Sequence, residues 1–275
     1  MSDITRLPIR QIRPFDGHPY QVIDNEEMDA LAESILKQGV LSPILVRPIG
    51  ENQYELVSGH RRLRAAQIAG FQTIPAYVRE MDRDEAAIAL VDSNLNRDHL
   101  LLSEKAFAYK LKLDAIRHQG KQLLSANCLS ADMVSPLDSG RSVQRIIRLT
   151  YLIPELLKMV DESIMAITPA VNISYLTDQE QYWVLDEMLK NSCAPSFAQS
   201  VWLKEKSIDE TLTQEHIAAL LAREKPNQRT DIHIPMDKLK GIIPDNYSAH
   251  QAEDFILKAC EFYSKHLKRQ KGANL

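Results

Sequence analysis

The feature that most constrains the fold is a glycine, Gly59, that separates a strand-like run from an arginine-rich helix. Residues 53–58 (QYELVS) are short and rich in strand-forming side chains, and the helix that follows ends at Gly70. The first backbone N–H groups of a helix lack internal acceptors, and the positive end of the helix dipole lies there. A strand, a glycine and a helix in this order therefore predict an anion site.

Three arginines stand in the first turns of this helix: Arg61, Arg62 and Arg64. Arg61 and Arg64 are three residues apart and share a face, whereas Arg62 points elsewhere. Forked guanidinium donors suit phosphate oxygens, but basic first turns are also often only solvated. The pattern leaves open whether these arginines meet a phosphate, an acidic neighbour or water.

The segments around this junction predict a small α+β unit. Asp24 and Glu27 have the spacing of a capping box, and the helix that they begin ends at Gly39. Residues 42–48 (SPILVRP) pair with QYELVS as a hairpin across a turn in IGENQ. A third strand follows at residues 73–80, with alternating apolar side chains, and a further helix begins near Arg83.

From about residue 103 the pattern becomes helical. Ser103 is the expected N-cap of a helix whose apolar stripe contains Ala106, Phe107, Leu111 and Leu113. A later helix begins with Thr168 as its N-cap and Pro169 at its first position. This part of the chain is expected to pack as a helical bundle.

A basic helix near residues 140–152 has two distinct stripes. The apolar stripe contains Val143, Ile146, Ile147 and Thr150, and the basic stripe contains Arg141, Arg145 and Arg148. Such a helix after the tight turn DSG is typical of the recognition helix of a helix-turn-helix, although a solvated basic face gives the same pattern.

In the helix-turn-helix interpretation, side chains near the start of the basic helix read the DNA. Ser142, Gln144 and Arg145 face base edges, and the remaining arginines face phosphates. Pro136 shortens or distorts the preceding helix, which weakens the expectation of sequence-specific affinity.

The overall composition of the chain limits which binding partners and which cellular compartment are expected. The formal net charge of -4 shows no global preference for nucleic acid, so DNA binding has to come from a local basic patch. Three widely spaced cysteines fit neither a disulfide framework nor a zinc site. No apolar run approaches the ~18 residues that a membrane span needs, so we expect a cytoplasmic protein without a membrane partner.

Several motifs occur in a fixed order across roughly residues 8–117. They include residues 59–66 (GHRRLRAA) and residues 93–97 (SNLNR). In this respect the chain resembles the ParB family of chromosome- and plasmid-partition proteins. The spellings SGHRR and VDSNL resemble ParB-like proteins of mobile genetic elements.

The resemblance implies three parts. The first is a ParB/sulfiredoxin-like α+β domain at residues 1–98, and the second is an all-α helix-turn-helix domain at residues 99–225. A small C-terminal segment at residues 226–275 is placed to mediate dimerisation. The implied function is DNA binding in partition, maintenance or regulation of a plasmid or integrative element. The implied partners are double-stranded DNA, a second copy of the chain and a partition ATPase. The implied location is the nucleoid.

The resemblance also implies a nucleotide, CTP with magnesium. Gly59, His60, Arg61 and Arg62 then become the nucleotide-binding candidates, and Asn94 becomes the candidate near the metal. Two family carboxylates are replaced here, by His60 and Ser93. A neutral imidazole and a hydroxyl cannot position a metal and water as carboxylates do, so we expect weak or no hydrolysis. Asp92 can substitute for one carboxylate only if the backbone brings it close.

His60 has three interpretations: a catalyst or metal ligand, a phosphate hydrogen-bond donor, or a structural residue of the turn. No partner histidine or carboxylate is visible at a useful spacing, which disfavours the first.

Two competing functions remain open. One is a helix-turn-helix transcription regulator without a partition role, and the other is a nucleotide-dependent enzyme on the same fold. Sulfiredoxin chemistry needs a cysteine beside its His-Arg pair, where this chain has Ser58 and Gly59.

Overall fold

A computed structural model describes most of the chain in two compact units, residues 1–223 and residues 224–275. The described residues are 4–95, 100–119, 131, 133–136, 138–222, 251, 255, 256, 258–260 and 263. Asn96, Arg97 and the C-terminal tail therefore lie outside them, and the expected domain boundaries at 98 and 225 stay predictions. The described residues of the second unit are helical.

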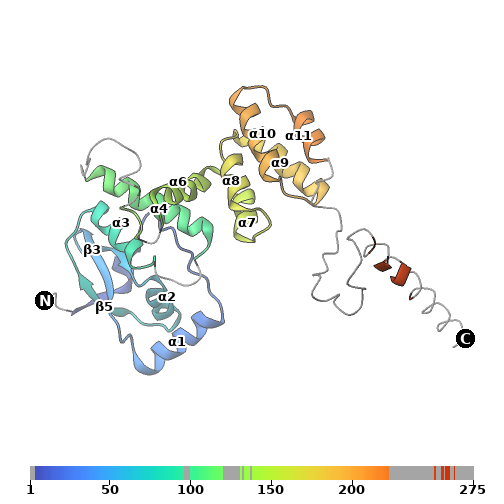
Figure 1. Ribbon diagram of the computed structural model, residues 1–275. Coiled ribbons are helices and arrows are strands. Elements are labelled where there is room, and N and C mark those ends of the chain that lie inside the picture. Colours follow the sequence, from blue (N-terminus) through green and yellow to red (C-terminus); the bar gives the residue numbers. More distant parts are fainter. Residues whose placement is uncertain are drawn as a thin grey trace, which may run out of the picture. The chain divides into compact units, whose positions relative to one another are not determined.

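The N-terminal part of the first unit is a five-stranded mixed sheet in the order β1-β5-β3-β4-β2 (Figure 1). The strands are β1 (Ile4–Pro8), β2 (Ile12–Pro14), β3 (Ile44–Gly50), β4 (Gln53–Ser58) and β5 (Thr73–Val78). The β3–β4 and β1–β5 pairs are antiparallel, while β3–β5 and β2–β4 are parallel. The expected hairpin and third strand are thus confirmed.

Strands β1 and β2 were not expected from the sequence. A 3₁₀ turn at Ile9–Gln11 joins them, and each pairs with a single neighbour at an edge of the sheet. In β1 only Leu7 is buried, and β2 has three residues. Strands this short carry almost no alternation of apolar and polar side chains, which is the signal that identifies a strand.

Helices cover both faces of the sheet. Adjacent residues of a strand point to opposite faces, so Leu56 and Val57 belong to different cores. Leu56 packs in the core that includes α1 (Glu26–Gln38) and α2 (His60–Ile68). Val57 packs in the core that includes α3 (Arg83–Asp92). The strand–glycine–helix junction therefore lies at the C-terminal end of β4, an inner strand of a sheet that is covered on both faces.

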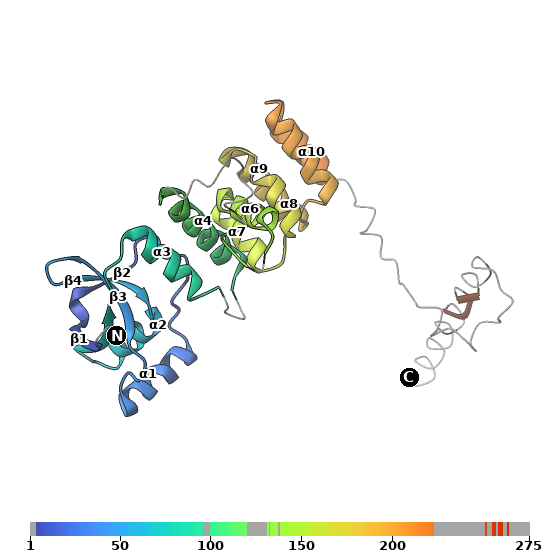
Figure 2. The same ribbon diagram turned by 60° about the vertical axis from the view of Figure 1, so that its left-hand side comes forward.

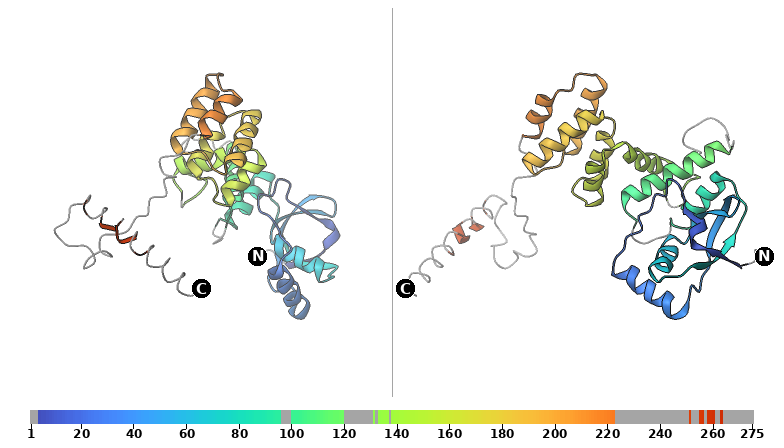
Figure 3. Two further views of the ribbon diagram at one scale, coloured as in Figure 1. Left: turned by 90° about the vertical axis from the view of Figure 1, so that its right-hand side faces the viewer. Right: turned by 180° about the vertical axis from the view of Figure 1, so that it is seen from behind.

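Figures 2 and 3 show the helices that follow the sheet in the first unit. Buried side chains of these helices form one further core. Its helices are α4 (Leu102–His118), α6 (Gly140–Arg148), α7 (Pro154–Asp161), α8 (Ile167–Ile173), α9 (Asp178–Asn191), α10 (Phe197–Ile208) and α11 (Gln214–Leu221). An α+β domain followed by a helical domain is the expected fold class. None of the helices in the described part of the chain is long and apolar enough to cross a membrane.

Three expected helix starts were wrong by one or two residues. Asn25, and not Asp24, caps α1, because its side chain accepts a hydrogen bond from the Met28 amide. Helix α4 begins after Leu101, so Ser103 lies in its first turn. Helix α8 begins after Ala166, which places both Thr168 and Pro169 inside the helix. Asp24 and Asn25 have a similar capping tendency, but Leu101 and Ala166 make no side-chain cap hydrogen bond, so capping preference could not locate the starts of α4 and α8.

The expected apolar stripe of α4 was correct in part. Ala106 and Leu113 are buried, but Phe107 is 42% exposed. The apolar stripe of α6 was correct at Val143 and Ile146.

Candidate nucleotide and DNA-binding sites

Gly59 is the N-cap of α2 and adopts a left-handed conformation with φ 102°. A Cβ atom at this position would lie 2.7 Å from the Cγ2 atom of Ile44 on the neighbouring strand β3. Only glycine accepts both the backbone angle and this close approach without strain. The junction therefore needs a glycine for its shape, independently of any ligand.

The arginines of one face of α2 meet carboxylates from the segment that starts α1. Arg61 Nη2 lies 3.0 Å from Glu27 Oε2, and Arg64 forms a two-pronged ion pair with Asp24. The hydrogen bond from Arg64 lowers the pKa of Asp24 below its ordinary value. Both pairs are exposed, so each contributes little stability and can be exchanged for another anion.

Arg62 points away from these carboxylates and binds backbone carbonyl groups of the segment before β3. Its Nη1 atom donates to the Ser42 carbonyl at 2.6 Å and to the Pro43 carbonyl at 2.5 Å. Burial lowers the pKa of the Arg62 guanidinium. In this structure Arg62 ties α2 to the segment before β3, which leaves Arg61 as the arginine of the motif that can turn most easily to a ligand.

His60 lies against a second histidine that sequence reasoning did not connect with it. The His18 and His60 ring centroids are 3.7 Å apart at an angle of 37°, and Tyr20 meets the His18 ring edge-on at 5.5 Å. Stacked rings turn their faces, and not their nitrogens, toward each other. This contact therefore suits packing of residues 18–20 on the start of α2 better than a shared metal or proton. The only signal in the sequence was a second histidine in the run HPYQVI.

Asn94 and its neighbours lie at the C-terminal end of α3. Asn94 is 5% exposed, and its Nδ2 atom donates to the Leu90 carbonyl at 2.7 Å and to Ser93 Oγ at 3.1 Å. Only the side-chain oxygen of Asn94 is left as a possible metal ligand. Asp92 is in an ion pair with Lys112 of α4, so it faces the helical part.

The described residues contain no cluster of three or more His, Cys, Asp or Glu side chains that could hold a metal ion. A magnesium ion near Asn94 would therefore need most of its oxygen ligands from water and nucleotide phosphates.

Helix α6 starts at a well-defined cap and presents its basic stripe at the surface. Ser139 Oγ accepts a hydrogen bond from the Ser142 amide. Arg141 and Arg145 are exposed, while Ser142 and Gln144 are half-buried. The Arg145 guanidinium also reaches Thr168 Oγ1 of α8, at 2.8 Å.

Arg148 is held differently from the other arginines of this stripe. Its guanidinium donates to Ser174 Oγ at 3.2 Å and to the Ser174 carbonyl at 2.8 Å. It also lies between two tyrosine rings, 4.5 Å from the centre of Tyr151 and 4.0 Å from that of Tyr175. Arg148 therefore fixes the end of α6 against α8, in addition to any contact with DNA.

Asp138 anchors the turn before α6 to helix α4. Its Oδ2 atom accepts from Tyr109 Oη at 2.5 Å and from Lys105 Nζ at 2.7 Å. Burial alone would raise the pKa of Asp138, but the hydrogen bonds from Lys105 and Tyr109 outweigh it, and the pKa is lowered. The aspartate of the DSG turn is therefore a charged anchor. The first helix of the expected helix-turn-helix, at residues 130–137, is described in part. Of its described residues, 131 and 133–136, only Ala131 is helical, and Met133 and Val134 form a turn.

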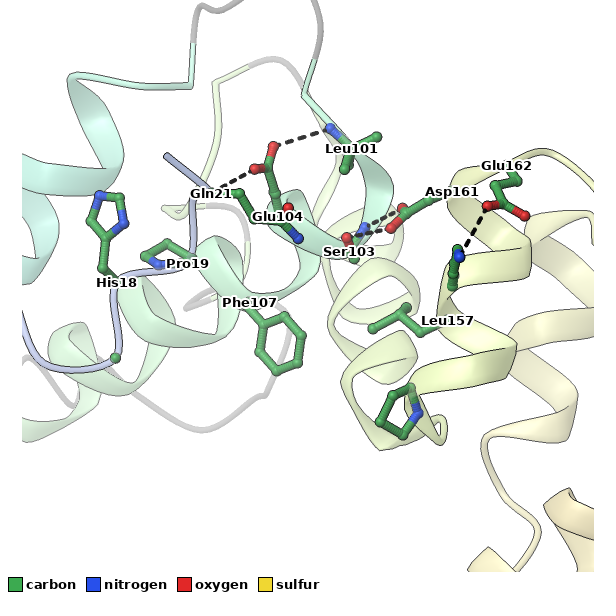
Figure 4. A pocket seen from close by; sticks show the side chains of 13 residues that line it. His18, Pro19, Gln21, Leu101, Ser103, Glu104, Phe107, Leu157, Asp161 and Glu162 are labelled. Carbon is green, nitrogen blue, oxygen red and sulfur yellow. Dashed lines mark hydrogen bonds and ion pairs between the residues drawn. The ribbon is translucent and has the colours of Figure 1, made fainter. Parts of the chain in front are cut away.

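A cavity of about 730 Å³ lies where residues 17–21 approach α4 and α7 (Figure 4). Glu104 Oε1 accepts from the Gln21 amide at 2.8 Å, and Asp161 accepts from the amide and hydroxyl of Ser103. Glu162 is a third carboxylate in the lining, and it pairs with Lys158 at 3.7 Å, which leaves an excess of carboxylates. This acidic lining disfavours phosphate, so the cavity is not a candidate triphosphate site.

Comparison with known proteins agrees with this architecture. The ParB N-terminal domain family matches residues 1–95. A chromosome-partitioning protein of Thermus thermophilus is 33% identical over 202 residues, which cover 73% of this chain and 70% of the relative. The chain belongs to the ParB family.

Other relatives match longer or shorter parts of this chain. A nucleoid occlusion protein of Bacillus cereus is 30% identical over 232 residues, covering 83% of this chain and 71% of the relative. A probable chromosome-partitioning protein ParB of Pseudomonas putida is 45% identical over 108 residues, which is 37% of that relative's length. The chain thus matches well under half of some relatives.

Among solved structures, Caulobacter crescentus ParB complexed to the centromeric parS site is 24% identical. The match covers 79% of this chain and 98% of that C-terminally truncated ParB chain, with a TM-score of 0.42. Caulobacter ParB complexed with CTP-gamma-S is 26% identical over 68% of this chain and 99% of that chain, with a TM-score of 0.33.

Proposed function

We propose that this ParB-family protein is a DNA-binding partition protein that reads duplex DNA with helix α6. The observation that carries the proposal is the exposed basic stripe of α6, Arg141 and Arg145, on a helix with a fully buried opposite face at Val143. Side chains of these types at the start of such a helix reach base edges in the major groove. The preceding residues would complete a helix-turn-helix, with Ser142 and Gln144 as further readers.

We propose that the junction at Gly59 holds the triphosphate of CTP. The helix start offers backbone amides of residues 60–62, which have no intrahelical acceptor. Arg61 would exchange its exposed pair with Glu27 for a phosphate oxygen. Arg62 and His60 lie beside Arg61 in the chain, and Asn94 would offer its side-chain oxygen to a magnesium ion held mainly by phosphates and water. Because both family carboxylates are replaced, by His60 and Ser93, we expect hydrolysis of a bound nucleotide to be weak or absent.

The biological setting is a further proposal. The spellings SGHRR and VDSNL favour maintenance of a plasmid or integrative element, with a homodimer and a partition ATPase as partners. A second candidate is nucleoid occlusion, since the relative in Bacillus cereus carries that function in its name and spans most of this chain. A regulator of transcription would use the same α6 surface without partition.

The testing experiment is binding of the purified full-length protein to fragments of its host's DNA, selected from a genomic library, with and without CTP. We expect one enriched sequence motif, and a change in retention on closed DNA when CTP is added. Enrichment of DNA fragments that share no motif would overturn the proposal that α6 reads the base sequence. A motif with no response to CTP would overturn the nucleotide proposal alone.

Mapping of the DNA sites that the protein binds in its native host distinguishes between these biological roles. Sites confined to a plasmid or integrative element support element maintenance, whereas sites spread over the chromosome support nucleoid occlusion or regulation.

A further inference from the structure

Three basic side chains and two tyrosines form an alternating stack, here called the cation–ring ladder. Its members, in spatial order, are Lys110, Tyr151, Arg148, Tyr175 and Lys204. The Lys204 ammonium lies 3.7 Å from the centre of Tyr175, and the Lys110 ammonium lies 5.2 Å from that of Tyr151. Arg148 occupies the middle, between the two rings.

The ladder joins segments that are far apart in sequence. Lys110 comes from α4, Tyr151 ends the 3₁₀ turn Leu149–Tyr151 after α6, and Lys204 comes from α10. Tyr151 is 52% exposed and Tyr175 is 42% exposed, so the stack lies at the surface. No pattern in the sequence relates Lys110 to Lys204.

A tyrosine ring positions a cation without neutralising it. The ring attracts the cation through its quadrupole, which restricts the side chain but leaves the full positive charge. Among the described residues, no carboxylate forms an ion pair with Lys110, Arg148 or Lys204. Lys190 on α9, by contrast, is paired with Glu187 at 2.7 Å and with Asp186 at 3.8 Å.

The ladder continues the basic stripe of α6. Arg141, Arg145 and Arg148 follow one another at spacings of four and three residues, and Tyr151 follows three residues later. Ordered positive charges of this kind, in a chain whose net charge is -4, fit a polyanion with regularly spaced charges.

We propose that the cation–ring ladder binds the phosphate backbone of duplex DNA beside the groove that α6 enters. Lys110 and Lys204 are the phosphate-contacting residues, and Tyr151 and Tyr175 position them through the contacts described above. This inference rests on the proposed function and adds α4 and α10 to the DNA-binding surface.

The test is the salt dependence of binding of full-length protein to a mixed-sequence duplex, followed by fluorescence anisotropy. Each phosphate contact contributes about 0.9 to the slope of the logarithm of affinity against the logarithm of salt concentration. We expect Lys110→Gln and Lys204→Gln each to reduce the slope by about 0.9, and the double variant by about twice as much. Lys204→Arg should keep the slope.

Two controls make the test specific. Lys190→Gln removes a charge that is more exposed than those of Lys110 and Lys204 but is already paired, so its slope should match that of the wild type. Tyr175→Phe retains the ring and should bind as the wild type does, whereas Tyr175→Leu should bind more weakly because Lys204 loses its platform.

The outcomes separate this inference from the proposed function. An unchanged slope in the double variant, with normal binding by the wild type, overturns the ladder alone. Failure of the wild type to bind any duplex at low salt overturns the ladder and the proposed function together.

Discussion

His60 stacks on His18, with ring centroids 3.7 Å apart, at the position where the family motif has a carboxylate. The imidazole is therefore used to pack residues 18–20 on the start of α2. A ring in this arrangement cannot replace a carboxylate in positioning a metal-bound water.

We expect the wild-type protein to hydrolyse CTP at close to the background rate. The double variant His60→Glu, Ser93→Glu restores both carboxylates and should hydrolyse CTP about tenfold faster or more. Phosphate release from purified protein, with and without DNA, measures this. His60→Gln with Ser93→Gln is the matched control and should stay at background. Equal rates for the wild type and the Glu variant would show that the carboxylates are not what is missing.

Gly59→Ala should lower the free energy of unfolding by about 2–4 kcal/mol. The cost combines a left-handed backbone angle with a Cβ atom only 2.7 Å from Ile44 Cγ2. Urea denaturation followed by circular dichroism gives the value. Gly50→Ala is the control, since nothing lies within 4 Å of its Cβ position and its φ is ordinary. If both alanine variants were equally stable, the close approach to β3 would not constrain the junction.

Arg145→Ala should weaken binding to the preferred DNA motif by about 1–3 kcal/mol and relax sequence preference at one base pair. The reason is that Arg145 is exposed near the start of α6 and has a single neutral partner, Thr168 Oγ1, among the described residues. Anisotropy on the motif and on single-base variants of it measures both effects. Thr168→Val removes the internal partner but keeps the arginine, so it should retain the preference. Unchanged affinity and preference in Arg145→Ala would mean that α6 is not the reader.

Arg148→Ala should destabilise the helical part by about 2 kcal/mol, because two hydrogen bonds to Ser174 and two ring contacts are lost. The thermal midpoint is the readout. Arg141→Ala, on the exposed side of the same helix, should change stability by less than about 0.5 kcal/mol. A midpoint shift of equal size in both variants would contradict the different roles assigned to these arginines.

Asp138→Asn should destabilise the protein at neutral pH, and the difference from the wild type should shrink in acid. The pKa of Asp138 is lowered in the folded state, so the unfolded state binds the proton more readily. The charged group therefore stabilises the fold above the ordinary carboxyl pKa of 3.8, and this contribution is lost as the pH falls through the lowered value. Urea midpoints measured between neutral pH and pH ~3 test the sign. A difference that grew toward low pH would refute it.

Much of the local structure was readable from the sequence, because it depends on near neighbours in the chain. The hairpin β3–β4, helix α2 between two glycines, and the two-sided helix α6 follow from hydrophobic period and from glycine at helix ends. The order of the motifs also identified the family. Edge strands β1 and β2 were missed because pairing with one neighbour, and not an alternating pattern, defines them.

The partners of the basic residues were decided by the tertiary structure. Charge spacing predicted an anion site at Arg61, Arg62 and Arg64, but it could not distinguish a phosphate from a carboxylate 34 or 40 residues away, such as those of Glu27 and Asp24. The sequence likewise placed the three arginines of α6 in one stripe. Only packing of the end of α6 against α8 separates Arg145, which is exposed, from Arg148, which lies between two tyrosine rings. The charge of a side chain follows from its residue type, whereas the groups that it contacts depend on how distant segments of the chain pack together.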